Sequence, residues 1–129
     1  MSHAVVLRES GRAQDQSYNL KGLVDPAADS GVAAGASIVE FVDALLGADE
    51  GRLSRARAAL EASLGPAGVT AVSVVAANFS KNDRIANATG IPLEAMFVRG
   101  SEDFRADLGV DGFASAKNSL EAYARGDES

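Results

Sequence analysis

The chain has 129 residues, the size of one ordinary domain, and its 47% hydrophobic and 23% charged residues are typical of a globular protein. The formal net charge of −6 disfavours binding to nucleic acid, because a phosphate backbone requires a basic surface. The chain has no cysteine, which excludes disulfides, thiol chemistry and cysteine-based metal sites within it.

The N-terminal segment is the least regular part of the sequence. The stretch HAVVLRE, residues 3–9, fits either a short strand or a first helical turn. The stretch GLVDPAADSGVAAGAS, residues 22–37, predicts a loop, because Pro26 has no backbone N–H and the glycines loosen the chain. We therefore predict an irregular segment over residues 1–35, within a single helical domain that spans residues 1–129.

The sequence shows no sign of targeting or membrane insertion. The opening residues, MSHAVVLRESGRAQ, lack the apolar run and the cleavage site of a signal peptide. No continuous apolar run approaches the length that a membrane span needs. We expect a cytoplasmic protein that acts away from membranes and nucleic acid.

Two amphipathic helices are predicted over residues 37–46 and 52–64. The first, SIVEFVDALL, places its apolar residues on one face at helical spacing. Ser37 is the expected N-cap of this helix, with Glu40 as its capping-box partner, and a glycine follows its last residue. The second helix is closed by a Gly-Pro pair and carries its charged residues on the opposite face.

A longer helix is predicted over residues 66–89, with Pro66 in its first turn. Its apolar positions recur at helical period over more than 20 residues, which favours a helix over a strand despite the β-branched residues. Gly90 is the expected C-terminal cap, and Pro92 prevents extension. We predict that this is the central, mostly buried helix, with Phe79 in the core.

The remainder of the chain predicts shorter helices. A turn of helix follows Pro92, a break falls at Gly100, and Ser101 is a suitable N-cap for a short helix. A last helix is expected to hold Phe113 and Tyr123 on its apolar face. The fold class is therefore all-α, with about five helices. Because aromatics are only 5% and alanines are many, we expect tight helix packing that continues into a homo-oligomer.

One stretch resembles a known family. RIANATGIPLE, residues 84–94, preceded by AANF, is similar to the C-terminal half of the AhpD-like superfamily, which contains alkylhydroperoxidase and carboxymuconolactone decarboxylase relatives. The resemblance extends over roughly residues 31–119 and includes FRADLGVDGFASAKNS. It implies an AhpD-like helical domain.

The chain departs from that family where the redox chemistry lies. The peroxidase branch carries a Cys-x-x-Cys pair with a nearby histidine and glutamate, whereas this chain has no cysteine and its one histidine is His3. The aspartate usual in the family's tail pattern is Asn87 here. No catalytic residue is therefore carried over, thiol peroxidase activity is not expected, and neither a metal nor a cofactor is predicted.

Four polar residues at and just before the start of the family-like stretch are candidates for ligand binding. Arg84, beside Asp83, is suited to hold a substrate carboxylate. The alternative, which we favour, is that Arg84 anchors the helix C-terminus or pairs with a carboxylate from another helix. Asn78 and Asn82 are spaced to share a helix face. They either orient a ligand or join helices by hydrogen bonds in the interior, and we favour the second.

Three functions remain open at this stage. The first is a non-redox AhpD-like protein that acts by self-assembly or by binding a ligand or partner. The second is a cofactor-independent enzyme of the decarboxylase or isomerase type, in which Arg84 holds a small organic anion. The third is the scaffold half of a split peroxidase whose cysteine-bearing half is a separate chain.

Overall fold

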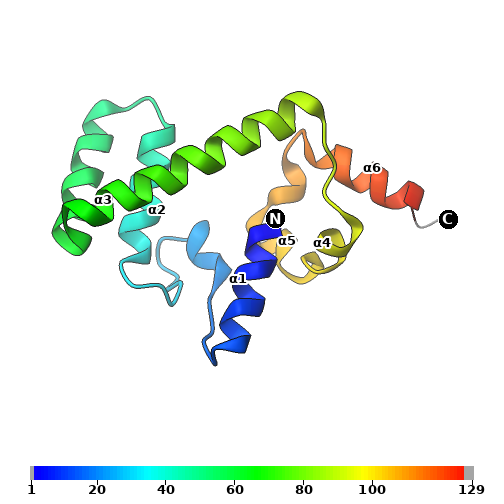
Figure 1. The fold of residues 1–129 in the computed structure, drawn as a ribbon, viewed down its shortest axis with the longest axis horizontal. Coiled ribbons are helices and arrows are strands. Elements are labelled where there is room, and N and C mark those ends of the chain that lie inside the picture. Colours follow the sequence, from blue (N-terminus) through cyan, green and yellow to red (C-terminus); the bar gives the residue numbers. More distant parts are fainter. Residues whose placement is uncertain (1, 127–129) are drawn as a thin grey trace.

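The computed structural model describes residues 2–126, which form six α-helices and two short 3₁₀ helices and contain no strand (Figure 1). The elements are α1 (Ser2–Ala13), η1 (Leu20–Leu23), α2 (Gly35–Leu46), α3 (Glu50–Thr89), α4 (Ala95–Arg99), α5 (Glu102–Leu108), η2 (Val110–Gly112) and α6 (Ala116–Gly126). The predicted all-α class is confirmed, with six helices in place of about five.

The N-terminal segment is more regular than its sequence indicates. Residues 2–13 form α1, whereas residues 14–34 are loop and turn around the short η1. Arg8 fixes α1 against α5, because its guanidinium donates to Asp103 Oδ2 at 2.6 Å and to the Gly100 carbonyl at 2.7 Å. These partners lie more than 90 residues away along the chain, so no local sequence pattern predicts these contacts.

The main apolar core lies between α2 and the first part of α3. Its fully buried residues are Phe41, Ala44, Ala56 and Leu60. Glu40 closes the edge of this core by accepting two hydrogen bonds from Arg52, at 2.8 and 2.7 Å. The predicted capping box with Ser37 is therefore wrong: α2 begins earlier, after Ala34, and Glu40 joins two helices instead of capping one.

α3 is two helices joined at Gly65. Gly65 has φ 70° and ψ 174°, which is outside any helical conformation and is accessible mainly to glycine. Pro66 follows in the first turn of the second helix, as predicted. Asp49 caps the first helix by accepting the Arg52 N–H at 2.8 Å. The predicted boundary between helices at Gly65–Pro66 is thus confirmed.

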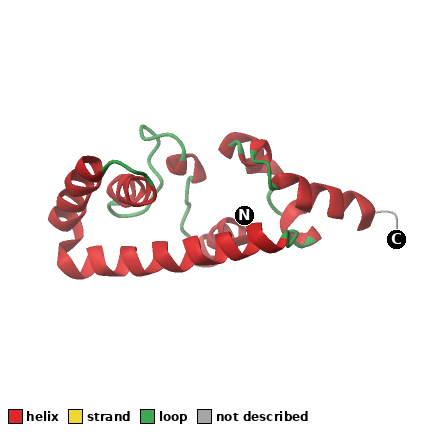
Figure 2. Cartoon of the chain, turned by 90° about the horizontal axis from the view of Figure 1, so that it is seen from above, coloured by secondary structure: helices red, strands yellow, loops and turns green. Residues whose placement is uncertain are grey.

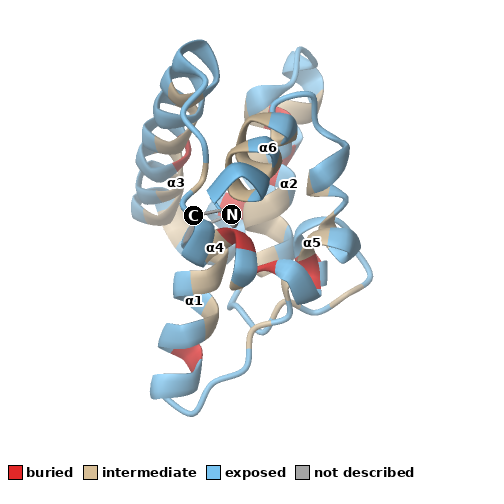
Figure 3. Ribbon diagram, turned by 90° about the vertical axis from the view of Figure 1, so that its right-hand side faces the viewer, coloured by how far each residue is buried: buried red, intermediate tan, exposed pale blue. Residues whose placement is uncertain are grey.

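The second part of α3, residues 66–89, bridges the molecule and is largely exposed (Figures 2 and 3). Ala76 is its only buried residue, whereas Val74 is 64% exposed and Ile85 is 53% exposed. The prediction of a mostly buried central helix is therefore wrong. Apolar residues occupy both sides of this helix. The rest of the chain packs against one side and leaves the other side exposed.

Phe79 lies on the covered side of α3 but is only half-buried. Its ring meets the His3 ring edge-on, with the centroids 4.7 Å apart and the planes at 87°. Phe79 therefore joins α3 to α1. The prediction that Phe79 lies in the core is wrong.

A second, smaller apolar cluster lies in the C-terminal half. Val98 and Phe104 are buried, and the Arg8 guanidinium lies 4.9 Å from the centroid of the Phe104 ring. Ser101 stands at the N-cap position of α5 but makes no capping bond; its hydroxyl donates to the Phe97 carbonyl at 2.7 Å. Phe113, predicted within the last helix, precedes α6 and is 66% exposed.

Two phenylalanines offer a matched test of this core. Phe41 is 2% exposed, so Phe41→Ala should lower the free energy of unfolding by about 3–5 kcal/mol. Phe113→Ala removes the same atoms from an exposed position and should change it by less than about 0.5 kcal/mol. Urea denaturation of both variants measures the difference, and equal losses would show that the core is placed wrongly.

The C-terminus of α3 provides a second prediction. Gly90 has φ 66° and ψ 24°, and the Ile91 N–H reaches back to the Ala86 carbonyl at 3.2 Å, which is a Schellman-type cap. Gly90→Ala should cost about 1–2 kcal/mol, because a side chain disfavours this left-handed conformation. The control is Gly112→Ala, where φ is not positive and an added Cβ meets nothing within 4 Å. Equal melting temperatures for the two variants would contradict the assignment of Gly90 as the cap.

Candidate functional site

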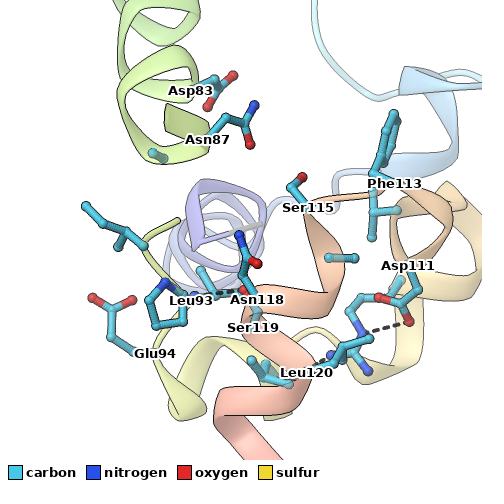
Figure 4. Close-up of a pocket in the computed structure, with 17 residues that line it drawn as sticks. Asp83, Asn87, Leu93, Glu94, Asp111, Phe113, Ser115, Asn118, Ser119 and Leu120 are labelled. Carbon is cyan, nitrogen blue, oxygen red and sulfur yellow. Dashed lines mark hydrogen bonds and ion pairs between the residues drawn. The ribbon is translucent and has the colours of Figure 1, made fainter. Parts of the chain in front are cut away.

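A cleft lies where the end of α3 meets the C-terminal helices (Figure 4). It has a volume of about 570 Å³, within the range of small-molecule sites. Four parts of the chain line it: the last turns of α3, the loop of residues 91–94, single residues of α4, α5 and η2, and residues 113–120. Residues distant in sequence thus converge at one place.

Two local features shape the cleft. The Gly90 cap and Pro92 end α3, and the loop of residues 91–94 follows. The Leu93 N–H then donates to the Ser119 hydroxyl at 2.8 Å, which ties this loop to α6. The loop is therefore held at both ends, and it forms one wall of the cleft.

The charges lining the cleft are unbalanced. Asp83, Glu94 and Asp111 are acidic, and Arg105 is the single basic lining residue. Arg105 is already engaged: its Nε lies 3.4 Å from Asp111 Oδ2, and its Nη1 donates to the Val98 carbonyl at 3.3 Å. Within residues 2–126, Asp83 and Glu94 form no ion pair, so the cleft carries two uncompensated carboxylates.

Arg105 is the most buried charged group of the cleft. Its side chain is 17% exposed, and Nε is out of contact with solvent without a hydrogen bond of good geometry. The contact with Asp111 is therefore an ion pair by distance and not a hydrogen bond. Because a buried guanidinium needs partners, Arg105 is best understood as a structural cation that joins α5 to η2.

Polar groups, most of them uncharged, face one another across the cleft. Figure 4 shows Asn118 and Ser115 on one side and Asn87 and Asp83, from α3, on the other. In the described part of the chain, the side-chain amides of Asn87 and Asn118 make no hydrogen bond to another residue. They remain available to a ligand or to water.

The four residues predicted to bind a ligand do not form one site. Asp83 lines the cleft, whereas Asn78, Asn82 and Arg84 do not. Adjacent helical residues differ in direction by about 100°, so Asn82, Asp83 and Arg84 point to three sides of α3. A cluster in sequence is therefore not a cluster in space here.

The structural roles that we favoured for the other three residues are wrong, whereas ligand binding by these residues stays a prediction. Arg84 is exposed, and its guanidinium donates to Ser80 on the same helix at 3.4 Å, with no carboxylate partner within residues 2–126. Asn78 accepts from Lys81 at 3.0 Å on the helix surface. Asn82 is exposed as well, so neither asparagine joins helices in the interior.

Sequence reasoning missed Arg105, Asn118 and Phe113. Each reaches the cleft through a turn or a long-range contact that periodicity does not encode. A weak signal exists for Phe113, because the glycines at 109 and 112 indicate a turn that removes it from the helix. No comparable signal marks Arg105 or Asn118.

The perturbed carboxyls of the chain lie outside the cleft. A hydrogen bond from Arg52 lowers the pKa of Glu40, the backbone N–H of Arg52 lowers that of Asp49, and a hydrogen bond from Arg8 lowers that of Asp103. All three hold helices in place. The cleft itself contains no histidine, and no group of three or more metal-binding side chains occurs among residues 2–126.

The chain was also compared with known proteins. No family model, curated protein or solved structure matches it. The resemblance of residues 84–94 to the AhpD-like superfamily therefore stays a prediction. The cleft offers carboxylates, amides, hydroxyls and one paired guanidinium, an arrangement suited to binding.

The two arginines separate a structural role from a surface role. Arg84→Ala should change the free energy of unfolding by less than about 0.5 kcal/mol, because the side chain is exposed and touches only its own helix. Arg105→Ala should cost about 1–3 kcal/mol, because it removes the hydrogen bond to the Val98 carbonyl and the ion pair with Asp111 from a largely buried side chain. Melting curves of the two variants check this, and a larger loss for Arg84→Ala would restore the predicted tether.

Proposed function

We propose that this chain is a non-redox, AhpD-like helical protein that acts by self-association through the exposed side of α3. The observation that carries the proposal is the exposure of an uncharged helix: residues 66–80 contain no charged side chain, yet Ala76 alone among them is buried. An apolar surface of this length is uncommon on a monomer. A second protein surface that packs on this apolar surface would remove it from contact with water.

The contact surface follows from helical geometry. One line of exposed residues runs along the helix opposite Ala76, and we call it the outer face: Ala67, Ala71, Val74, Asn78, Lys81 and Ile85. Small side chains at its start allow another helix to approach closely, at the usual axis separation of about 8–10 Å. The outer face is therefore suited to helix–helix packing.

A second copy in antiparallel orientation fits the charge pattern. A two-fold axis near Val74 sets the charge-free residues 66–80 of one copy against the same residues of the other. Lys81, Asp83 and Arg84 then lie beyond the centre of the contact. A parallel pair would instead place Lys81 beside its own equivalent, which is repulsive.

Membrane insertion fits the same helix less well. By length and composition, α3 is the one helix among residues 2–126 that is apolar enough to cross a membrane, and 6% of its most apolar window is buried. However, Gly65 interrupts the helix, so the charge-free helical part is residues 66–80, about 22 Å long. A hydrocarbon core is about 30 Å thick. This mismatch in length favours a protein surface over a membrane as the partner of the exposed side of α3.

The other two functions stand as follows. An enzyme acting on an organic anion is not favoured, because Arg84 lies outside the cleft and the cleft has excess negative charge. A split peroxidase remains the competing explanation of the outer face, since a separate cysteine-bearing chain would cover the same residues. The two occupants are distinguished by whether the purified chain associates alone.

Self-association is tested by light scattering over the micromolar range. The chain should exceed its monomer mass of 13.2 kDa, and Val74→Glu should return it to a monomer, because a charge is placed in the contact. The matched control is Val24→Glu, in an N-terminal loop and 54% exposed, which should associate like the parent.

Two outcomes contradict the proposal. A parent chain of 13.2 kDa at the highest concentration would show that the outer face does not bind a second copy. Association that survives Val74→Glu would place the contact elsewhere on the molecule. A stable complex with a co-expressed cysteine-bearing chain, formed by a parent that is monomeric alone, would favour the split peroxidase.

A further inference from the structure

The cleft is a second surface, separate from the outer face of α3. Asp83 and Asn87 project from α3 on the side opposite Ile85, because these positions are about half a turn apart around the helix. Association through the outer face therefore leaves the cleft accessible. An inference about the cleft does not depend on the proposed self-association.

The charges of the cleft favour a cation. Arg105 is occupied by Asp111 and by the Val98 carbonyl, so it is not free to bind an anion. Asp83 and Glu94 have no cationic partner within residues 2–126, and both line the cleft. A concave surface with an excess of one sign of charge concentrates ions of the opposite sign.

The carboxylates alone would indicate only a solvated surface; the apolar lining makes the cleft more selective. Leu93, Val98, Val110 and Leu120 contribute apolar atoms from three different segments. Phe113 stands at the cleft with 66% of its surface exposed, which is unusual for an aromatic residue without a partner. Its ring can cover an apolar group and can also attract a cation to its face.

Hydrogen-bond acceptors complete the arrangement. The amide oxygens of Asn87 and Asn118 are unused within the described residues, and they come from opposite sides of the cleft (Figure 4). An ammonium group has up to three N–H donors and no acceptor, so carboxylate and amide oxygens both suit it. A metal ion is a poorer fit, because no group of three metal-binding side chains converges in residues 2–126.

We propose that the cleft binds a small organic ammonium ion with an apolar body. The ammonium group lies toward Asp83 and the asparagine amides, and the apolar body packs on Phe113 and Leu120. The volume of about 570 Å³ suits a small molecule and is too small for a folded protein segment of any length.

The probes are n-hexylammonium, n-hexanoate and n-hexanol, which share one chain length and differ in charge. Binding is followed by the amide and Phe113 ring shifts in NMR titrations of the full chain. Hexylammonium should give saturable shifts confined to residues 83–94 and 105–120, with an affinity at least tenfold above that of hexanoate. Hexanol should bind more weakly than hexylammonium, because it has no charge for Asp83 or Glu94.

Variants assign the binding to the cleft. The double variant Asp83→Asn with Glu94→Gln should weaken hexylammonium binding about three- to tenfold, the range for two partly exposed ion pairs. Phe113→Ala should weaken both hexylammonium and hexanol. The matched control is Glu61→Gln, on the exposed surface of the first half of α3, which should leave the affinity unchanged.

Several results would overturn the proposal. Equal affinity for hexanoate, or an unchanged affinity of the double variant, would show that Asp83 and Glu94 do not select a cation. An equal loss of hexylammonium affinity in Glu61→Gln would show that the net negative charge of the chain, and not the cleft, attracts the cation. Tighter binding of N-acetyl-lysine methylamide than of hexylammonium would assign the cleft to a lysine side chain of a protein partner.

Discussion

The backbone conformation at Gly65 is the constraint on which the rest of this structure depends. With φ 70° and ψ 174°, it ends one helix and lets Pro66 begin another without an intervening loop. The first helix returns to pack on α2 and bury Phe41 and Leu60. The second packs Val69 and Val72 against the same core and then crosses to the C-terminal helices. A helix that continued straight through residue 65 could not make both sets of contacts.

This arrangement produces two small apolar clusters with a helix between them. The cluster of α2 and α3 is closed by Glu40 and Arg52, and the C-terminal cluster is closed by Arg8 reaching α5 from α1. Neither covers the outer face of α3. We interpret the outer face as the surface left for a second copy, and the cleft at the end of the same helix as a separate site for a small ligand.

Local patterns predicted the elements better than their surroundings. The Gly65–Pro66 break and the Gly90 cap were predicted because glycine and proline restrict the backbone directly. The burial of residues 66–89 was mispredicted, because helical periodicity shows which residues share a side and not what covers that side. The four candidate site residues do not share one cleft for a related reason: Asp83 reaches the cleft, while its neighbour Arg84 does not line it.

The central claim is that the outer face of α3 is an interface between copies of this chain. Hydrogen exchange of the amides of residues 66–80, measured as a function of protein concentration, tests it most directly. The account predicts that exchange at these residues slows as the concentration rises, while exchange in α2 stays constant. Exchange over residues 66–80 that is independent of concentration, in a protein that remains folded, would contradict the claim.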